Sequence, residues 1–314
     1  MNFAGPLFLV GHSRSGTQLL RTLLNRHKQI AIVTNESKFI PAVMERFGPP
    51  SRLSDPAKIH DFYQFFSDTT FYRRLREKGF ALSEEELMRL SDPSSWESFF
   101  EVIFRFYAPS AGKKAESFIW GDKSPRYLKE LESFTTCFPN SKFIHIIRDP
   151  RDVCLSHKKR WRTPCELTAA KWQARVGESR QVGASLGAQR YRELRYEDLL
   201  LDTESVIRSL CDFLGVGFHP DMTRLAEPVS DYQDGDAGLA QKIVTINREK
   251  WREAMGRSEL KRVEEIAYSQ LVNLGYAITL AHEANPLSEK RKMRIEKRAR
   301  LLNRLPERIA RRWV

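Results

Sequence analysis

A short apolar run near the amino terminus leads into a turn bounded by glycines and then into a helical pattern. The run is Pro6–Val10, the turn is Gly11–Gly16 (GHSRSG), and leucines recur at helical spacing from Leu19 to Leu24. A continuous apolar run of this length is typical of a strand buried on both faces. The order strand, tight loop and helix therefore predicts an α/β domain whose loop presents backbone N–H groups and the positive end of a helix to an anion.

Strand and helix patterns alternate along most of the chain. We predict further strands at Ile30–Val33, Lys142–Ile147 and Tyr191–Tyr196, and helices at about 151–160 and at Thr203–Leu214, which ends before Gly215. Such alternation is typical of a parallel sheet. The predicted fold class is therefore α/β, with a P-loop-type parallel sheet flanked by helices.

The segment between the second and third predicted strands has helical periodicity, and we predict a helical insertion at about 42–118. It is rich in aromatic residues, with 13 of the chain's 34 between positions 62 and 107. Two interpretations stay open for these side chains. They form the core of the insertion, or some of them form the wall of an acceptor pocket.

Composition limits the class of protein. The 314 residues are 41% hydrophobic, which is too apolar for a disordered chain, and we predict one α/β domain over residues 1–284. No apolar run approaches the roughly 20 residues that cross a bilayer. The four cysteines have no CxxC spacing and Met1–Gly5 has no basic signal-type region, so we expect reduced thiols and a cytoplasmic location.

Positive charge is concentrated at the carboxyl terminus. Residues 285–314 hold eleven Lys and Arg against three Glu, and therefore eight of the twelve net positive charges. Apolar residues such as Ile295 and Leu302 recur there at helical intervals, and Trp313 is the penultimate residue, so we predict a basic amphipathic tail. The tail either packs on the body or lies in solvent, or residues 290–314 contact an anionic membrane surface. Because little charge is left on the body, we do not expect a nucleic-acid partner.

A second anion signature follows the strand predicted at 142–147. Arg148 leaves the carboxyl end of that strand, and Ser156 follows about two helical turns later, so the two are placed to bind one phosphate. Ligands of open parallel sheets bind at this edge. Position 17 is Thr17, where a nucleotide hydrolase carries Lys, and this disfavours ATP or GTP hydrolysis. Two functions stay open as alternatives on these features alone. One is a P-loop kinase of small molecules, and the other is a protein that binds nucleic acid or membrane through its basic tail.

These motifs resemble those of sulfotransferases that use 3′-phosphoadenosine 5′-phosphosulfate (PAPS), closest to the tyrosylprotein sulfotransferases and related bacterial enzymes. Arg14–Gln18 (RSGTQ) resembles the R-S-G-T-T loop that holds the 5′-phosphosulfate in that family, with Gln18 in place of the second threonine. Arg148 and Ser156 resemble the pair that holds the 3′-phosphate.

The resemblance extends over four more segments. Glu36–Pro41 resembles the family segment that carries a catalytic glutamate, and Trp120–Pro125 (WGDKSP) resembles the element whose lysine contacts the transferring sulfonate. Arg195–Leu199 resembles the part in which a tyrosine, here Tyr196, approaches the cofactor. Residues 246–251 resemble the final cofactor-covering region, where the expected basic residue is displaced to Lys242 or Arg248.

The resemblance implies transfer of a sulfonate from PAPS to an acceptor hydroxyl of a sugar, a lipid-linked alcohol, a small metabolite or a tyrosine, by in-line displacement. It implies that Glu36 is the general base and that Lys123 and Arg14 stabilise the transferring and leaving oxygens. The implied cofactor contacts are Arg14, Ser15, Gly16, Thr17, Gln18, Arg148, Ser156 and Tyr196.

No metal is expected, because the sequence has no HExxH, paired CxxC or EF-hand spacing. Two alternatives concern the base. Glu36 could instead cap a helix that begins near Lys38, and His12, His145 and His157 are rival bases.

Overall fold

Five parallel strands form one sheet in the order β2-β3-β1-β4-β5 in the computed structural model, which describes residues 3–33, 36–48, 55–108, 119–225, 243 and 245–303. The central strand pairs with β3 and β4, and Leu9 lies opposite Lys123 on one side and Ile144 on the other. Because all strands run in one direction, their carboxyl ends meet at a single edge. The strands are β1 (Leu7–Val10), β2 (Ile30–Ile32), β3 (Ile119–Lys123), β4 (Lys142–Ile147) and β5 (Tyr191–Arg195).

Different helices cover the two faces of the sheet, because side chains alternate along a strand. Leu7 and Leu9 pack in one core with α1 (Thr17–Leu24), α10 (Tyr196–Leu201), α11 (Thr203–Leu214) and the short η4 (Pro220–Thr223). Phe8 and Val10 pack in another core with α7 (Leu131–Cys137), η3 (Pro125–Lys129) and the insertion. The loops after the strands are thereby held between two apolar layers.

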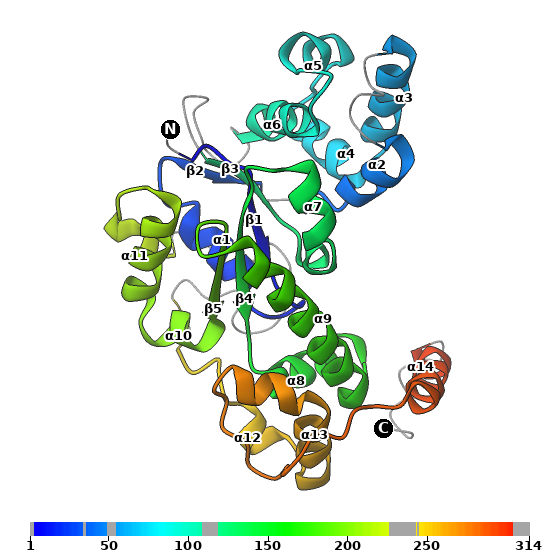
Figure 1. Ribbon diagram of the computed structural model, residues 1–314, viewed down its shortest axis with the longest axis vertical. Coiled ribbons are helices and arrows are strands. Elements are labelled where there is room, and N and C mark those ends of the chain that lie inside the picture. The colour runs from blue at the N-terminus through cyan, green and yellow to red at the C-terminus, as the bar shows by residue number, and fades with distance from the viewer. Residues whose placement is uncertain are drawn as a thin grey trace.

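The insertion between β2 and β3 consists, in its described part, of five helices that lie together at one end of the molecule (Figure 1). Asp55, Thr69, Ser83 and Ser95 cap four of them by accepting a backbone N–H. Most of its aromatic rings are buried against one another, so the interpretation as a core fits them. The helices are α2 (Ile40–Phe47), α3 (Pro56–Ser67), α4 (Thr70–Arg76), α5 (Glu84–Leu90) and α6 (Trp96–Tyr107), and the buried rings include Phe62, Phe66, Phe71, Phe99, Phe100 and Phe104.

The other end of the molecule is built from α8 (Pro150–Trp161), α9 (Cys165–Leu186), α12 (Trp251–Ala254) and α13 (Arg257–Asn273) (Figure 1). A buried ion network joins α8, α12 and α13. The Arg151 guanidinium lies 2.7 Å from carboxylate oxygens of both Asp149 and Glu264, and its centre is 3.7 Å from the Trp251 ring. This network fixes the start of α8, directly after β4, against the carboxyl-terminal helices.

The predicted fold class is confirmed, including the helical insertion between the second and third strands. One expected assignment was wrong: the third strand along the chain is β3, not the strand at 142–147, which is the fourth. Gly121, Asp122 and Lys123 have low strand propensity, so no local pattern indicates β3. The neighbouring strand β1 requires glycine at position 121, because a Cβ there would lie 2.2 Å from the Leu7 carbonyl oxygen.

The tail begins with α14 (Glu289–Asn303), which packs on the body. Ile295 is partly buried against the core of α8, α9 and α13, and Arg291 lies 2.7 Å from Glu166 of α9. Residues 304–314, which include Trp313, are outside the described part of the chain. None of the described helices has both the length and the apolar character that crossing a membrane requires.

Candidate active site

The loop after β1 is tightly turned and positions the start of α1. Gly16 has φ of 94°, in the left-handed region that favours glycine. A Cβ at this position would also lie 2.3 Å from the Tyr196 ring, so the loop and the start of α10 are in direct contact. Arg14 has φ of 73°, and the Ser15 N–H donates to the His12 carbonyl. Position 16 therefore requires glycine for two reasons, the positive φ of its backbone and the close contact with the Tyr196 ring.

Arg14 and Arg148 lie side by side with the other predicted cofactor residues. Arg14 Nε donates to Ser156 Oγ at 2.9 Å, and Arg148 donates to the Arg14 carbonyl at 3.1 Å. The centre of the Arg148 guanidinium is 4.6 Å from the centroid of the Tyr196 ring. The structure thus brings together the phosphate loop, the Arg148–Ser156 motif and Tyr196, which follow β1, β4 and β5.

Asn247 belongs to the same cluster and was not predicted as a site residue. Its side-chain amide donates to the Tyr196 hydroxyl at 2.8 Å, and its carbonyl accepts from Arg148 at 3.0 Å. The resemblance of residues 246–251 to a covering region was the available signal. Arg248 lies 3.1 Å from Glu249, while Lys242 is outside the described residues.

Two buried polar atoms make this cluster suitable for an anion. Ser15 Oγ and Arg148 Nε are both buried and lack a hydrogen-bond partner within the described residues. Both atoms are hydrogen-bond donors, and buried donors are normally satisfied. Thr17, the first residue of α1, is buried two positions after Ser15, and Gln18 is half-buried. The donor set fits phosphate groups of a nucleotide.

Glu36 and Lys123 form an ion pair at the same edge of the sheet. Glu36 Oε1 is 2.7 Å from Lys123 Nζ, and Oε2 is 2.8 Å from Lys38 Nζ. Burial alone would raise the pKa of Glu36, but the charges and hydrogen bonds of the two lysines outweigh burial and hold that pKa below its ordinary value. Burial lowers the pKa of Lys123, and Glu36 opposes this only in part. Glu36 is therefore ionised at neutral pH.

The alternatives for the base find less support. The N-cap of α2 is Phe39, with no side-chain hydrogen bond, so Glu36 does not cap that helix. Burial lowers the pKa of His12 and of His145 to about 3 and that of His157 to about 4. Because the pKa of Glu36 also lies below its ordinary value, basicity does not separate these groups, and the choice of Glu36 rests on its contact with Lys123. His157 does lie beside the loop, with Nε2 2.9 Å from Ser13 Oγ.

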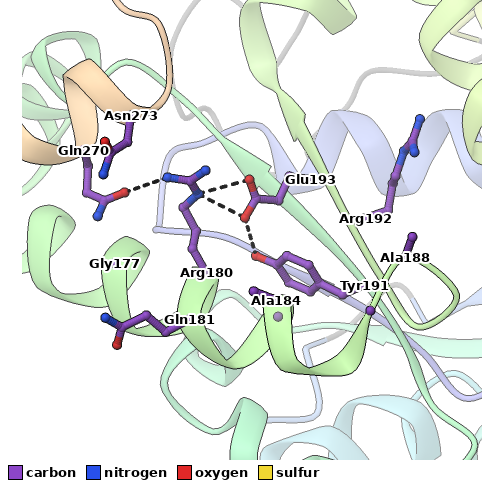
Figure 2. Close-up of a pocket in the computed structure, with 12 residues that line it drawn as sticks. Gly177, Arg180, Gln181, Ala184, Ala188, Tyr191, Arg192, Glu193, Gln270 and Asn273 are labelled. Carbon is purple, nitrogen blue, oxygen red and sulfur yellow. Dashed lines mark hydrogen bonds and ion pairs between the residues drawn. The ribbon is translucent and has the colours of Figure 1, made fainter.

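A separate pocket lies between α9, β5 and α13 (Figure 2). Arg180 crosses it and donates to Glu193 and to Gln270, both at 3.0 to 3.1 Å. The pocket includes Tyr191, the first residue of β5, and so lies toward the amino end of that strand, away from the edge where the predicted site residues gather. Within the described residues, no group of three His, Cys, Asp or Glu is placed to hold a metal ion.

Comparison with solved structures supports the fold. The chain is similar to a sulfotransferase domain from the curacin biosynthetic pathway, with 21% identity, a TM-score of 0.53 and coverage of 89% of this chain and 100% of that one. It is also similar to the sulfotransferase domain of the Synechococcus PCC 7002 olefin synthase, with 23% identity, a TM-score of 0.51 and coverage of 85% and 96%.

Sequence comparison assigns the family. The chain is 26% identical over 293 residues to omega-hydroxy-beta-dihydromenaquinone-9 sulfotransferase Stf3 of Mycobacterium bovis, which covers 80% of this chain and 74% of that protein. It is 23% identical over 289 residues to protein-tyrosine sulfotransferase 2 of Gallus gallus, covering 86% and 69%. The model of the sulfotransferase family matches residues 6–220, which is more than half of the chain and contains both anion motifs.

This match excludes the two alternative functions, a P-loop kinase of small molecules and a protein that only binds nucleic acid or membrane through its basic tail. The chain belongs to the sulfotransferase family and is an enzyme that transfers a sulfonate group from PAPS to an acceptor hydroxyl.

Proposed function

We propose that Glu36 is the general base of this transfer and that Lys123 and Arg14 stabilise the charge that develops on the sulfonate and the leaving oxygen. The observation that carries the proposal is the 2.7 Å pair between Glu36 and Lys123. Strand register supports it, because Lys123 lies opposite Leu9, two residues before the phosphate loop begins. Lys123, the partner of Glu36, and the phosphate loop thus belong to neighbouring strands at one edge of the sheet.

The remaining residues of the cluster hold the nucleotide. Arg14, Ser15, Gly16, Thr17 and Gln18 bind the 5′-phosphosulfate through backbone N–H groups and side-chain donors. Arg148 and Ser156 bind the 3′-phosphate, and the Tyr196 ring packs beside it. The orphaned donors at Ser15 Oγ and Arg148 Nε support this assignment.

The chemistry requires one proton transfer and one displacement. PAPS supplies the sulfonate and a phosphate leaving group. As the acceptor oxygen bonds to sulfur and the bond from sulfur to the phosphate oxygen breaks, Glu36 takes the hydroxyl proton. The Glu36 side chain is 25% exposed, and its Oε2 pairs only with Lys38, which is itself exposed and weakly held, so an acceptor hydroxyl can displace Lys38 from this oxygen. The buried ammonium of Lys123 remains fixed and supplies its charge without reorganisation.

Lys123→Gln tests the part of the proposal that concerns the sulfonate. We expect turnover to fall by about 10²–10³-fold, the usual loss for one electrostatic stabiliser. Affinity for adenosine 3′,5′-bisphosphate, which has no sulfonate, should stay within a few-fold. The control is Lys129→Gln, since Lys129 is exposed and pairs with Glu130. Equal turnover of the two variants would remove Lys123 from the reaction.

We also propose that the acceptor is a lipid-linked alcohol and that α14 contacts an anionic membrane surface. Lys290, Arg294 and Lys297 are exposed and fall on one face of α14, together with the exposed Met293, while Ile295 packs inward. A basic helix face with an apolar side chain is suited to lie on anionic headgroups. A relative named for a hydroxylated menaquinone supports this acceptor class.

Vesicle sedimentation and an acceptor panel test this second proposal. The variant Lys290→Glu/Arg294→Glu/Lys297→Glu should lose salt-sensitive binding to vesicles that contain phosphatidylglycerol. Lys28→Glu/Lys58→Glu/Lys78→Glu makes the same change of charge at exposed lysines elsewhere and should still bind. Transfer of label from PAPS should favour an isoprenoid alcohol over a sugar, a small phenol and a tyrosine peptide. Failure of the full chain to bind these vesicles would rule out the membrane contact, and preference for another acceptor would rule out the lipid class.

A further inference from the structure

A buried carboxylate lies directly behind the ion pair of Glu36 and Lys123. Asp122 is fully buried in β3 and accepts hydrogen bonds from Ser37 Oγ at 2.7 Å and from Ser124 Oγ at 2.8 Å. The Ser37 N–H also points to it, at 3.5 Å. Ser37 follows Glu36 in the chain and Asp122 precedes Lys123, so this contact joins the two segments that carry the ion pair.

Among its described residues, the segment around Glu36 has few other polar anchors, although Phe39 and Ile40 are buried in the apolar core. The segment connects β2 to α2, and Lys38 has φ of 57°, in the left-handed region that costs energy for a residue with a Cβ. The N-cap of α2 makes no side-chain hydrogen bond. Ser37, by contrast, is only 4% exposed and is held to Asp122 by both its backbone and its hydroxyl. Apart from the ion pair of Glu36 with Lys123, Asp122 is therefore the main polar contact that fixes the described part of this segment on the sheet.

Protonation fixes the direction of the hydrogen bonds. Burial raises the pKa of Asp122 to about 6, and the serine hydrogen bonds limit the rise, so the carboxylate is mostly ionised at pH 7.5. An ionised carboxylate only accepts, so both serine hydroxyls donate to it. Tyr127 is also buried, and its hydroxyl lies within hydrogen-bond distance of Ser37 Oγ. Because the Ser37 proton is already donated to Asp122, Tyr127 donates to Ser37. The Ser37 hydroxyl is therefore held by one acceptor and one donor.

Strand geometry shows why this carboxylate does not act on substrate itself. Asp122 lies opposite Phe8 and Lys123 lies opposite Leu9, so the two side chains leave β3 on opposite faces. Asp122 faces the apolar core beneath the insertion, whereas the Lys123 ammonium pairs with Glu36. A carboxylate without exposure and with both oxygens occupied has no path to an acceptor.

We propose that Asp122 is a positioning residue that holds Glu36 beside Lys123 through Ser37. The inference rests on the proposed role of Glu36 as the base. A base acts efficiently only within hydrogen-bond reach of the acceptor hydroxyl, so loss of the anchor allows Glu36 to move out of line. The first effect is on the rate of transfer and not on nucleotide binding, because the residues of the anion cluster lie on other loops.

The test compares each anchor variant in two backgrounds. We expect Ser37→Ala and Asp122→Asn each to lower the single-turnover rate by about 10- to 100-fold, the scale expected for a misplaced catalytic group. The dissociation constant for adenosine 3′,5′-bisphosphate should stay within about threefold of wild type. In the Glu36→Gln background, the same substitutions should cause almost no further loss, because no base remains to be positioned. Ser179→Ala removes another buried hydroxyl, which donates to Leu128, and should leave the rate unchanged.

The outcomes separate the two proposals. An equal loss in both backgrounds would mean that Ser37 and Asp122 support the fold in general, and would overturn the positioning role. A single Glu36→Gln variant with wild-type turnover would instead refute Glu36 as the base, whatever the anchor variants show. Ser37→Ala decides the question if Asp122→Asn does not fold, since it removes the same hydrogen bond and leaves the carboxylate in place.

Discussion

Arg14 Nε donates a 2.9 Å hydrogen bond to Ser156 Oγ, although the two residues are 142 positions apart in the sequence. The bond joins the loop after β1 to the helix after β4. Arg148 completes the connection by donating to the Arg14 carbonyl. The two anion motifs are therefore in direct contact at the edge of the sheet where the strands end.

Ser156→Ala and Arg148→Ala test which phosphate of the nucleotide these two residues bind. Both should weaken binding of adenosine 3′,5′-bisphosphate more than binding of adenosine 5′-phosphate, because contacts with the 3′-phosphate are lost. We expect about 10- to 100-fold for each contact, in line with about 1.5–3 kcal/mol for a hydrogen bond to a charged group. Calorimetric titration measures both constants. Lys159→Ala, at an exposed position on the same helix, is the control. Similar losses for both ligands would refute the assignment to the 3′-phosphate.

Gly16→Ala tests the contact between the phosphate loop and Tyr196. Gly79 offers a matched control, because it has a similar φ of 84° but a Cβ added there would meet nothing within 4 Å. Gly79→Ala should cost about 1 kcal/mol through backbone strain alone. Gly16→Ala should cost about 1–3 kcal/mol more, because its Cβ would overlap the tyrosine ring, and it alone should lower nucleotide affinity. Denaturant melts and nucleotide titration measure both effects.

The buried histidines predict a loss of stability in mild acid. Burial lowers the pKa of His145 to about 3 from an ordinary 6.5, so below pH 6.5 the unfolded chain binds a proton that the folded chain refuses. The free energy of unfolding therefore falls as pH falls, by about 2 kcal/mol for such a histidine at pH 5. His12 and His157 act in the same direction, and Asp122, whose pKa is raised, acts in the opposite one below about pH 6.

Urea unfolding at pH 7.5 and at pH 5 measures this dependence. His145→Gln should reduce the difference between the two free energies, whereas His282→Gln, at an exposed position, should leave it as in wild type. A difference that His145→Gln does not reduce would contradict the account of this buried histidine.

Local patterns predicted the elements whose residues carry their own signal. The apolar runs of β1 and β4 and the spacing of α11 are such cases. β3 was missed because Gly121 suits its neighbour Leu7 and not a strand in isolation, and α9 was missed because it has glycines and no single apolar stripe. In the candidate site, motif resemblance supplied Glu36 and Lys123, but the contact of Ser37 with Asp122 spans 85 residues and leaves no local pattern.

The most direct measurement is the single-turnover rate of Glu36→Gln, with enzyme in excess over radiolabelled PAPS and with an acceptor that the wild-type enzyme sulfonates. Glu45→Gln, at an exposed position of α2, makes the same substitution away from the site. We expect Glu36→Gln to bind adenosine 3′,5′-bisphosphate as wild type does and its rate to fall by about 10²–10⁴-fold, while Glu45→Gln keeps the wild-type rate. A Glu36→Gln rate within a few-fold of wild type, with chemistry limiting, would contradict this expectation.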